Sequence, residues 1–129
     1  RVAAAVLEQP IGICGGNEVL FEEQWRSWGK ELMARRADID AATLEMFGST
    51  MWGGDDFVLS VSRDDVRSTN TPLLVLPGAD EFHPTSIARE IATLAPRGEI
   101  LGSWNETPES LASTAVSVRQ FLRRHTPDQ

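Results

Sequence analysis

Three short apolar runs along the chain predict three β-strands. They are residues 2–7 (VAAAVL), 72–77 (PLLVLP) and 98–103 (GEILGS). Each run is rich in strand-favouring residues and is bounded by residues that form turns. We therefore expect strands at these three positions, separated by segments of very different length.

Helical spacing follows the second and third predicted strands. After residues 72–77, apolar side chains recur at Ile87, Ile91 and Leu94, with Pro84 suited to the first turn of a helix. After residues 98–103, Thr107 and Pro108 form a typical helix start. The second helix is expected to bury one face, made of Leu111, Ala115, Val118 and Leu122.

The order strand, helix, strand, helix predicts a parallel sheet with right-handed crossovers. At 129 residues the chain is long enough for one domain with a real core and too short to expect two. The fold class is therefore predicted as α/β, with a three-stranded parallel sheet and flanking helices in a single domain, residues 1–129.

The segment between the first and second strands, about residues 14–70, is too long for an ordinary crossover. Two stretches in it have helical spacing, and Asp38 or Asp40 can cap the start of the second. One interpretation is a pair of amphipathic helices with ordinary core faces; the other is a helical cap over an apolar pocket. The residues that carry the two patterns are Phe21, Trp25, Trp28, Leu32, Leu44, Phe47 and Met51.

Composition and charge argue against two classes of partner. Twelve basic and nineteen acidic residues give a formal net charge of −7, without a basic stripe. This balance disfavours nucleic acid and anionic membranes as partners. The single cysteine, Cys14, and the absence of a membrane-length apolar run or an evident leader predict a soluble, cytoplasmic protein.

The loop after the second strand carries the residues best suited to chemistry. Pro77 and Gly78 end the apolar run, and Asp80, Glu81 and His83 follow. In an open parallel sheet, ligands bind beyond the carboxyl ends of the strands, which is where this loop falls. The plainer interpretation is that Asp80 is an ordinary turn residue, because a Gly-Ala-Asp-Glu sequence is typical of turns.

Several stretches resemble the α/β-hydrolase superfamily. Residues 71–101 (TPLLVLPGADEFHPTSIAREIATLAPRGEIL) are similar to its seventh strand, acid loop, following helix and eighth strand. Residues 1–12 (RVAAAVLEQPIG) are similar to its sixth strand, and residues 118–127 (VRQFLRRHTP) to its closing helix. The tryptophan-rich segment stands where that family inserts its cap. The resemblance covers the back half of the fold.

The resemblance implies that Asp80 is the acid of a nucleophile-histidine-acid triad, in which an ionised carboxylate fixes the tautomer of a histidine. It also implies an upstream serine nucleophile, a small apolar ester-like substrate and no cofactor or metal. The expected pocket wall consists of Phe82, His83, Trp104, Trp25, Trp28 and Trp52.

Two features depart from the family pattern. The chain has no G-x-S-x-G motif, and residues 102–106 (GSWNE), where the family has its histidine, contain none. A competing set is Cys14 in Gly12-Ile13-Cys14-Gly15-Gly16, with Asp80 and His125. Pro10 interrupts the approach to Cys14, which argues for a loop there.

Other sites find less support in the sequence. Asp80, Glu81 and His83 are too few for a closed metal site, and no glycine-rich loop with a following lysine indicates nucleotide binding.

We therefore expect a portion of an ester or acyl hydrolase that contributes the acid loop and cap, and that does not turn over substrate alone. The partner implied is the N-terminal half of the fold. The alternatives are a non-catalytic binder of small apolar ligands, or an interaction module that forms homo-oligomers through the open edge of its first strand.

Overall fold

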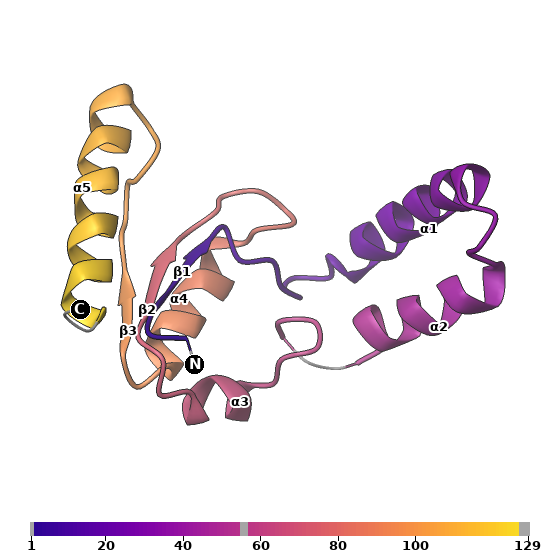
Figure 1. Cartoon of the computed structure of the whole chain (residues 1–129), viewed down its shortest axis with the longest axis horizontal. Coiled ribbons are helices and arrows are strands. Elements are labelled where there is room, and N and C mark those ends of the chain that lie inside the picture. Colours follow the sequence, from indigo (N-terminus) through magenta and orange to yellow (C-terminus); the bar gives the residue numbers. More distant parts are fainter. Residues whose placement is uncertain (1, 55–56, 127–129) are drawn as a thin grey trace.

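The computed structural model describes residues 2–54 and 57–126, in which three strands form one parallel sheet. The order is β1 (Ala5–Glu8), β2 (Leu73–Leu76) and β3 (Gly98–Ile100), with β2 in the middle (Figure 1). The α/β class, the parallel direction and the three strand positions are confirmed, although each strand is shorter than its apolar run. Residue 1, residues 55 and 56, and residues 127–129 lie outside the described part.

Within the described residues, five helices connect and flank these strands. The two helices predicted after β2 and β3 are confirmed, the long segment contains its two predicted helices, and a short third helix precedes β2. Their bounds are α1 (Glu18–Arg35), α2 (Ala41–Trp52), α3 (Arg63–Ser68), α4 (Thr85–Leu94) and α5 (Pro108–His125).

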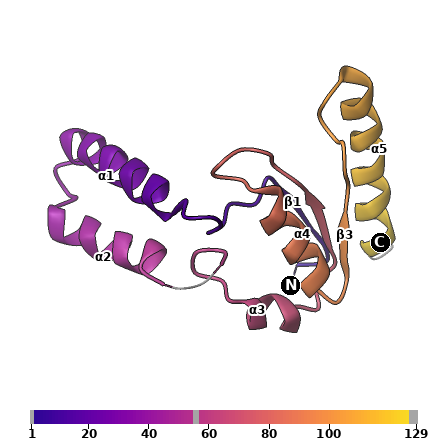
Figure 2. The same ribbon diagram turned by 180° about the vertical axis from the view of Figure 1, so that it is seen from behind.

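Side-chain alternation along β2 builds a core on each face of the sheet. Val75 is fully buried in a cluster with Ile87 and Ile91 of α4. Leu74 and Leu76 point to the opposite face, where they pack with Trp104 and Phe121. Helices α4 and α5 therefore cover opposite faces of the sheet, as Figures 1 and 2 show.

The buried face of α5 differs from the predicted one. Thr114 and Phe121 are buried and Val118 is half-buried, whereas Leu111, Ala115 and Leu122 are exposed. Phe121 fills the space over β2, so the helix turns its 114, 118 and 121 positions inward. The apolar stripe predicted from leucine and alanine positions was wrong in three of its four members.

Polar caps fix the helix starts. Asp40 accepts a hydrogen bond from the backbone N–H of Thr43, and Thr107 and Ser110 form a reciprocal capping box, which confirms both predicted starts. Pro84 lies immediately before α4 instead of within its first turn.

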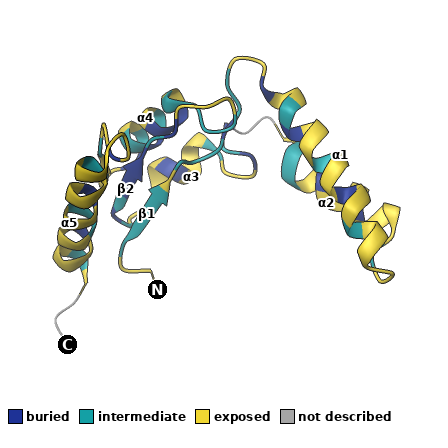
Figure 3. Ribbon diagram, turned by 90° about the horizontal axis from the view of Figure 1, so that it is seen from above, coloured by how far each residue is buried: buried dark blue, intermediate teal, exposed yellow. Residues whose placement is uncertain are grey.

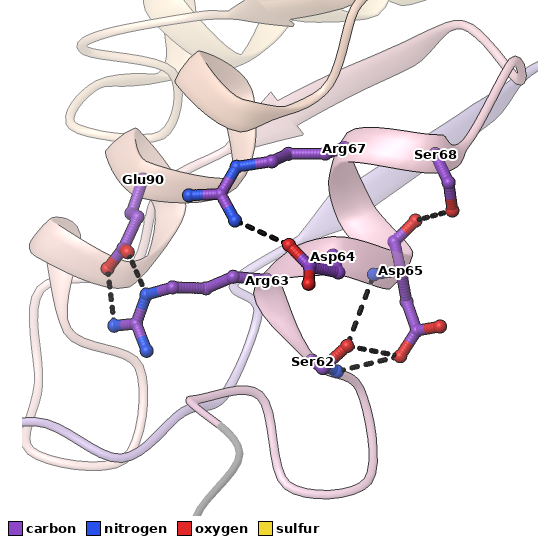
Figure 4. Close-up of polar contacts among 7 residues, drawn as sticks. All are labelled: Ser62, Arg63, Asp64, Asp65, Arg67, Ser68 and Glu90. Carbon is purple, nitrogen blue, oxygen red and sulfur yellow. Dashed lines mark hydrogen bonds and ion pairs between the residues drawn. The ribbon is translucent and has the colours of Figure 1, made fainter.

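Helix α3 is tied to its neighbour by polar contacts (Figure 4). Ser62 and Asp65 close its first turn as a capping box. Arg63 contacts Glu90 of α4 through an N–O distance of 2.6 Å, and its guanidinium also lies 4.5 Å from the ring centre of Phe57. These contacts place α3 beside α4, on the same face of the sheet.

Helices α1 and α2 form a hairpin that extends away from the sheet (Figures 1 and 3). Close packing inside the hairpin depends on small residues: a side chain at Gly48 would collide with the indole of Trp25. Much of the hairpin's apolar surface stays open to solvent, including Trp28, Met46 and Phe47. The two helices pack against each other, and Phe21, near the start of α1, contacts Phe82 outside the hairpin.

Candidate functional site

Residues 77–84, here called the 77–84 loop, leave the carboxyl end of the middle strand β2 and lead into α4. Inside the loop, the carboxylate of Asp80 accepts hydrogen bonds from the backbone N–H groups of Phe82 (2.9 Å) and His83 (2.8 Å). This is the geometry of an aspartate-capped turn. The predicted position of Asp80 at the carboxyl edge of the sheet is therefore observed, and so is its role in a turn.

The same carboxylate holds the imidazole of His83. Nδ1 of His83 lies 2.8 Å from Oδ1 and 3.0 Å from Oδ2 of Asp80. The His83 side chain is 29% exposed and that of Asp80 is 60% exposed. The backbone N–H of His83, followed by its ring, lowers the pKa of Asp80 below its ordinary value. Asp80 is therefore an ionised acceptor at neutral pH.

Contacts made by Thr85 and Gly78 fix the shape of the 77–84 loop. Thr85 donates its hydroxyl hydrogen to the carbonyl oxygen of Gly78 at 2.6 Å. A Cβ atom at Gly78 would lie 2.3 Å from Cβ of His83, so only glycine leaves room for the backbone of His83. The position of the imidazole is thus built into the loop.

Asn17, just before α1, fastens the start of the hairpin to this loop. Its amide nitrogen donates to the carbonyl oxygens of Gly12 (3.0 Å) and Glu81 (2.7 Å), and its amide oxygen accepts from the backbone N–H of Cys14 (2.8 Å). Asn17 is buried. The sequence analysis missed this residue, and its only signal was a polar side chain directly before a helical pattern.

A pocket of about 580 Å³ lies between this loop and the start of α1. Asp80 and Cys14 both line it. The sulfur of Cys14 is 3.2 Å from the hydroxyl oxygen of Ser86. Strand β1 ends at Glu8, well before Cys14, so Cys14 does not stand on a turn that follows a strand directly. The other lining residues are Gly15, Gly16, Asn17, Val19, Leu20, Ala79, Glu81 and Pro84.

Phe82 connects the 77–84 loop to the aromatic side chains of the hairpin. Its ring meets Phe21 edge to face at 5.4 Å between ring centres, and Phe21 stacks on Trp52 at 5.4 Å. Of the predicted pocket wall, Phe82 and Trp52 are therefore brought into one cluster with Phe21. That cluster borders the loop that carries Asp80 and His83.

Trp25 and Trp28 belong to a second aromatic cluster, farther along the hairpin. The Trp25 ring lies 5.4 Å from that of Trp28 and 5.3 Å from that of Phe47. Trp25 and Trp52 line a pocket of about 260 Å³ between α1 and α2, together with Glu18, Glu22 and Glu45. None of the six residues predicted as a pocket wall lines the pocket that contains Asp80; they are Phe82, His83, Trp104, Trp25, Trp28 and Trp52.

Trp104 takes part in the core on the α5 side of the sheet. It is buried among Leu74, Leu76 and Phe121, and its indole N–H donates to the carbonyl oxygen of Pro77 at 2.7 Å. It therefore supports the first residue of the 77–84 loop. An edge of Trp104 also lines a pocket of about 710 Å³ beside β3, which Gly78 and Ala79 share.

His125 lies away from Asp80 and Cys14. It contacts Arg97, with Nδ1 3.2 Å from the guanidinium, and its ring meets Phe121. The carbonyl oxygen of Arg97 accepts from the N–H of Leu73, the first residue of β2. His125 therefore sits near the amino end of the sheet, and the structure does not bring Cys14, Asp80 and His125 together.

Within residues 2–54 and 57–126, no group of three or more histidine, cysteine, aspartate or glutamate side chains is arranged to hold a metal ion. None of the helices in this part of the chain is long and apolar enough to cross a membrane.

Comparison of the chain with known protein families, with curated proteins and with solved structures finds no match.

Proposed function

We propose that this chain is the acid-loop and cap portion of an ester or acyl hydrolase of α/β-hydrolase type, and that it is inactive alone. The observation that carries the proposal is Asp80: an ionised carboxylate beyond the carboxyl end of the middle parallel strand, bonded to an imidazole nitrogen. Such a carboxylate orients an imidazole and stabilises its protonated form.

The sheet can take a further strand at β1. The N–H groups of Ala5 and Gln9 donate to the carbonyl oxygens of Pro72, just before β2, and of Leu76 in β2. By alternation, the backbone groups of Val6 and Glu8 point to the open edge. A strand added there carries the proposed serine nucleophile to the same edge of the sheet as Asp80, because the carboxyl ends of parallel strands lie together.

The substrate proposed is a small apolar ester. Phe82 and Trp52, through Phe21, give an apolar border to the 77–84 loop, and the neighbouring pocket of about 580 Å³ is within the range of small-molecule sites. Trp25, Trp28 and Trp104 lie outside this border and act on the substrate only indirectly in this proposal.

The test is hydrolysis of 4-nitrophenyl esters by the chain alone and by the product of the complete open reading frame that encodes it. We expect turnover from the complete product and none above buffer from the chain. Turnover by the chain alone that depends on Asp80 would contradict the proposal that the chain is inactive alone. An inactive complete product would contradict the proposed hydrolase activity.

A second candidate function is non-catalytic, either the binding of apolar molecules or self-association. The binding of apolar molecules is favoured by a pocket of about 460 Å³ beside β1 and α3, whose walls are almost entirely apolar. Binding of a neutral apolar fluorophore, weakened by Val58→Asp, would support the ligand-binding form. Light scattering that gives a dimer mass would support self-association through the β1 edge. The lining residues include Leu7, Pro10, Ile11, Val58, Val61, Val66, Leu73 and Ile91, with Asp65 and Thr69 as the polar members.

A further inference from the structure

The chain's two histidines lie in very different surroundings. The segment after β3, residues 101–107, contains no histidine, and His125 lies near the amino end of the sheet beside Arg97. His83 is in the 77–84 loop and contacts the carboxylate of Asp80. A hydrolase site built on Asp80 therefore has one imidazole of this chain within reach.

We infer that His83 is the base of this site, held by Asp80 as a dyad contained in a single loop. The inference rests on the proposed function and deepens it, because it names the residue that takes the proton. It differs from the family pattern, in which the histidine follows the next strand.

The first support for the dyad is that Nδ1, and not Nε2, of the His83 ring contacts Asp80. An ionised carboxylate only accepts hydrogen bonds, so the 2.8 Å contact requires a hydrogen on Nδ1 of His83. In the neutral ring, Nε2 then carries the lone pair. No residue of the described part of the chain forms a hydrogen bond with that Nε2 atom.

The second support is that the pair is rigidly held. Asp80 is fixed by the backbone N–H groups of Phe82 and His83 as well as by the ring. Gly78 leaves just enough space for His83, and Pro84 follows it directly with a restricted backbone. Bonds of this kind keep a catalytic ring from rotating, which raises the efficiency of proton transfer.

The proton path follows from these contacts. Nε2 of His83 takes the proton of the attacking serine hydroxyl as the oxygen bonds to the acyl carbon, and the ring becomes a cation next to ionised Asp80. The same proton then passes from Nε2 to the departing alkoxide, which leaves as an alcohol. Hydrolysis of the acyl enzyme repeats the path with water, so His83 ends neutral.

The tautomer is tested on the chain as it exists, with nitrogen-15 NMR of the imidazoles at alkaline pH, where histidine rings are neutral. We expect His83 to have a protonated Nδ1 and a bare Nε2, and Asp80→Asn to abolish this preference. Glu81→Gln, in the same loop, is the matched control and should leave it intact. A hydrogen on Nε2 of His83 in the unaltered chain would overturn the dyad.

The catalytic role is tested on the complete product described above, with His83→Gln and His125→Gln. We expect His83→Gln to lower kcat by about 10²–10⁴-fold with little change in KM, the effect of losing a general base. His125→Gln should stay close to the parent. Full activity in His83→Gln overturns this inference and leaves the proposed function standing. An inactive parent overturns the proposed function, and the dyad is then decided by the NMR result.

Discussion

Asn17 and Glu81, far apart in the sequence, are joined by a hydrogen bond of 2.7 Å from the side-chain amide of Asn17 to the carbonyl oxygen of Glu81. This contact couples the start of the α1–α2 hairpin to the loop that carries Asp80. Because Asn17 also bonds to Gly12 and Cys14, one buried side chain ties three backbone segments together.

Asn17→Ala should therefore lower the free energy of unfolding by about 1–3 kcal/mol, because buried backbone groups lose their partners. Urea denaturation measures the change. Asn105→Ala, at an exposed position, is the control and should have almost no effect. Equal stabilities of the two variants would contradict the role given to Asn17.

Replacing Phe121 tests the corrected face of α5. Phe121 is 1% exposed and packs on Leu74 and Leu76, so Phe121→Ala should cost about 3–5 kcal/mol. Leu122→Ala, one residue along and 37% exposed, should cost far less. A larger loss for Leu122 in thermal or urea unfolding would restore the face predicted from the sequence.

The ion pair between Arg63 and Glu90 should contribute little to stability. Their side chains are 48% and 36% exposed, and exposed pairs of this kind contribute about 0.2–1 kcal/mol (Figure 4). A double-mutant cycle with Arg63→Ala and Glu90→Ala measures the coupling. Arg63 also packs on Phe57, so its single variant should cost more than that of Glu90. A coupling well above this range would contradict the assignment as a surface pair.

The stability that Asp80 contributes to the folded chain should be lost in acid. The pKa of Asp80 is lower in the folded chain than in the unfolded one. Ionised Asp80 therefore raises the free energy of unfolding at pH values above its unfolded pKa. That contribution is lost as the pH falls through the folded value. Asp80→Asn should therefore flatten the pH dependence of unfolding over this acidic window, relative to Glu81→Gln. Identical pH profiles would contradict the hydrogen bonds assigned to Asp80.

Local pattern predicted the framework of the fold well. The strands and α4 were found because each is a short apolar or periodic run between turn residues, and Thr107 and Asp40 cap helices as their sequence positions indicate. The face of α5 was misjudged because Phe121 and Thr114 compete with leucines at nearby positions. Packing against β2 decided between them.

The position of the candidate site was predictable from the sequence, and its detailed geometry less so. Asp80 follows from the rule that parallel strands place function at their carboxyl ends. Its contact with His83 depends on the turn geometry of the 77–84 loop, which no periodicity encodes. Residue type alone does not distinguish Trp104 from Trp28. Trp104 is buried under α5, and Trp28 is exposed on the hairpin.

The most direct test of the account is the value of kcat/KM for 4-nitrophenyl ester hydrolysis by the complete product, compared between Asp80→Asn and Glu109→Gln, at an exposed position of α5. If Asp80 orients the base of the site, Asp80→Asn should lower kcat/KM by about 10⁴-fold, as the loss of a triad acid does, while Glu109→Gln stays near the parent. Equal activity of the two variants would contradict the account, because Asp80 would then be a turn residue alone.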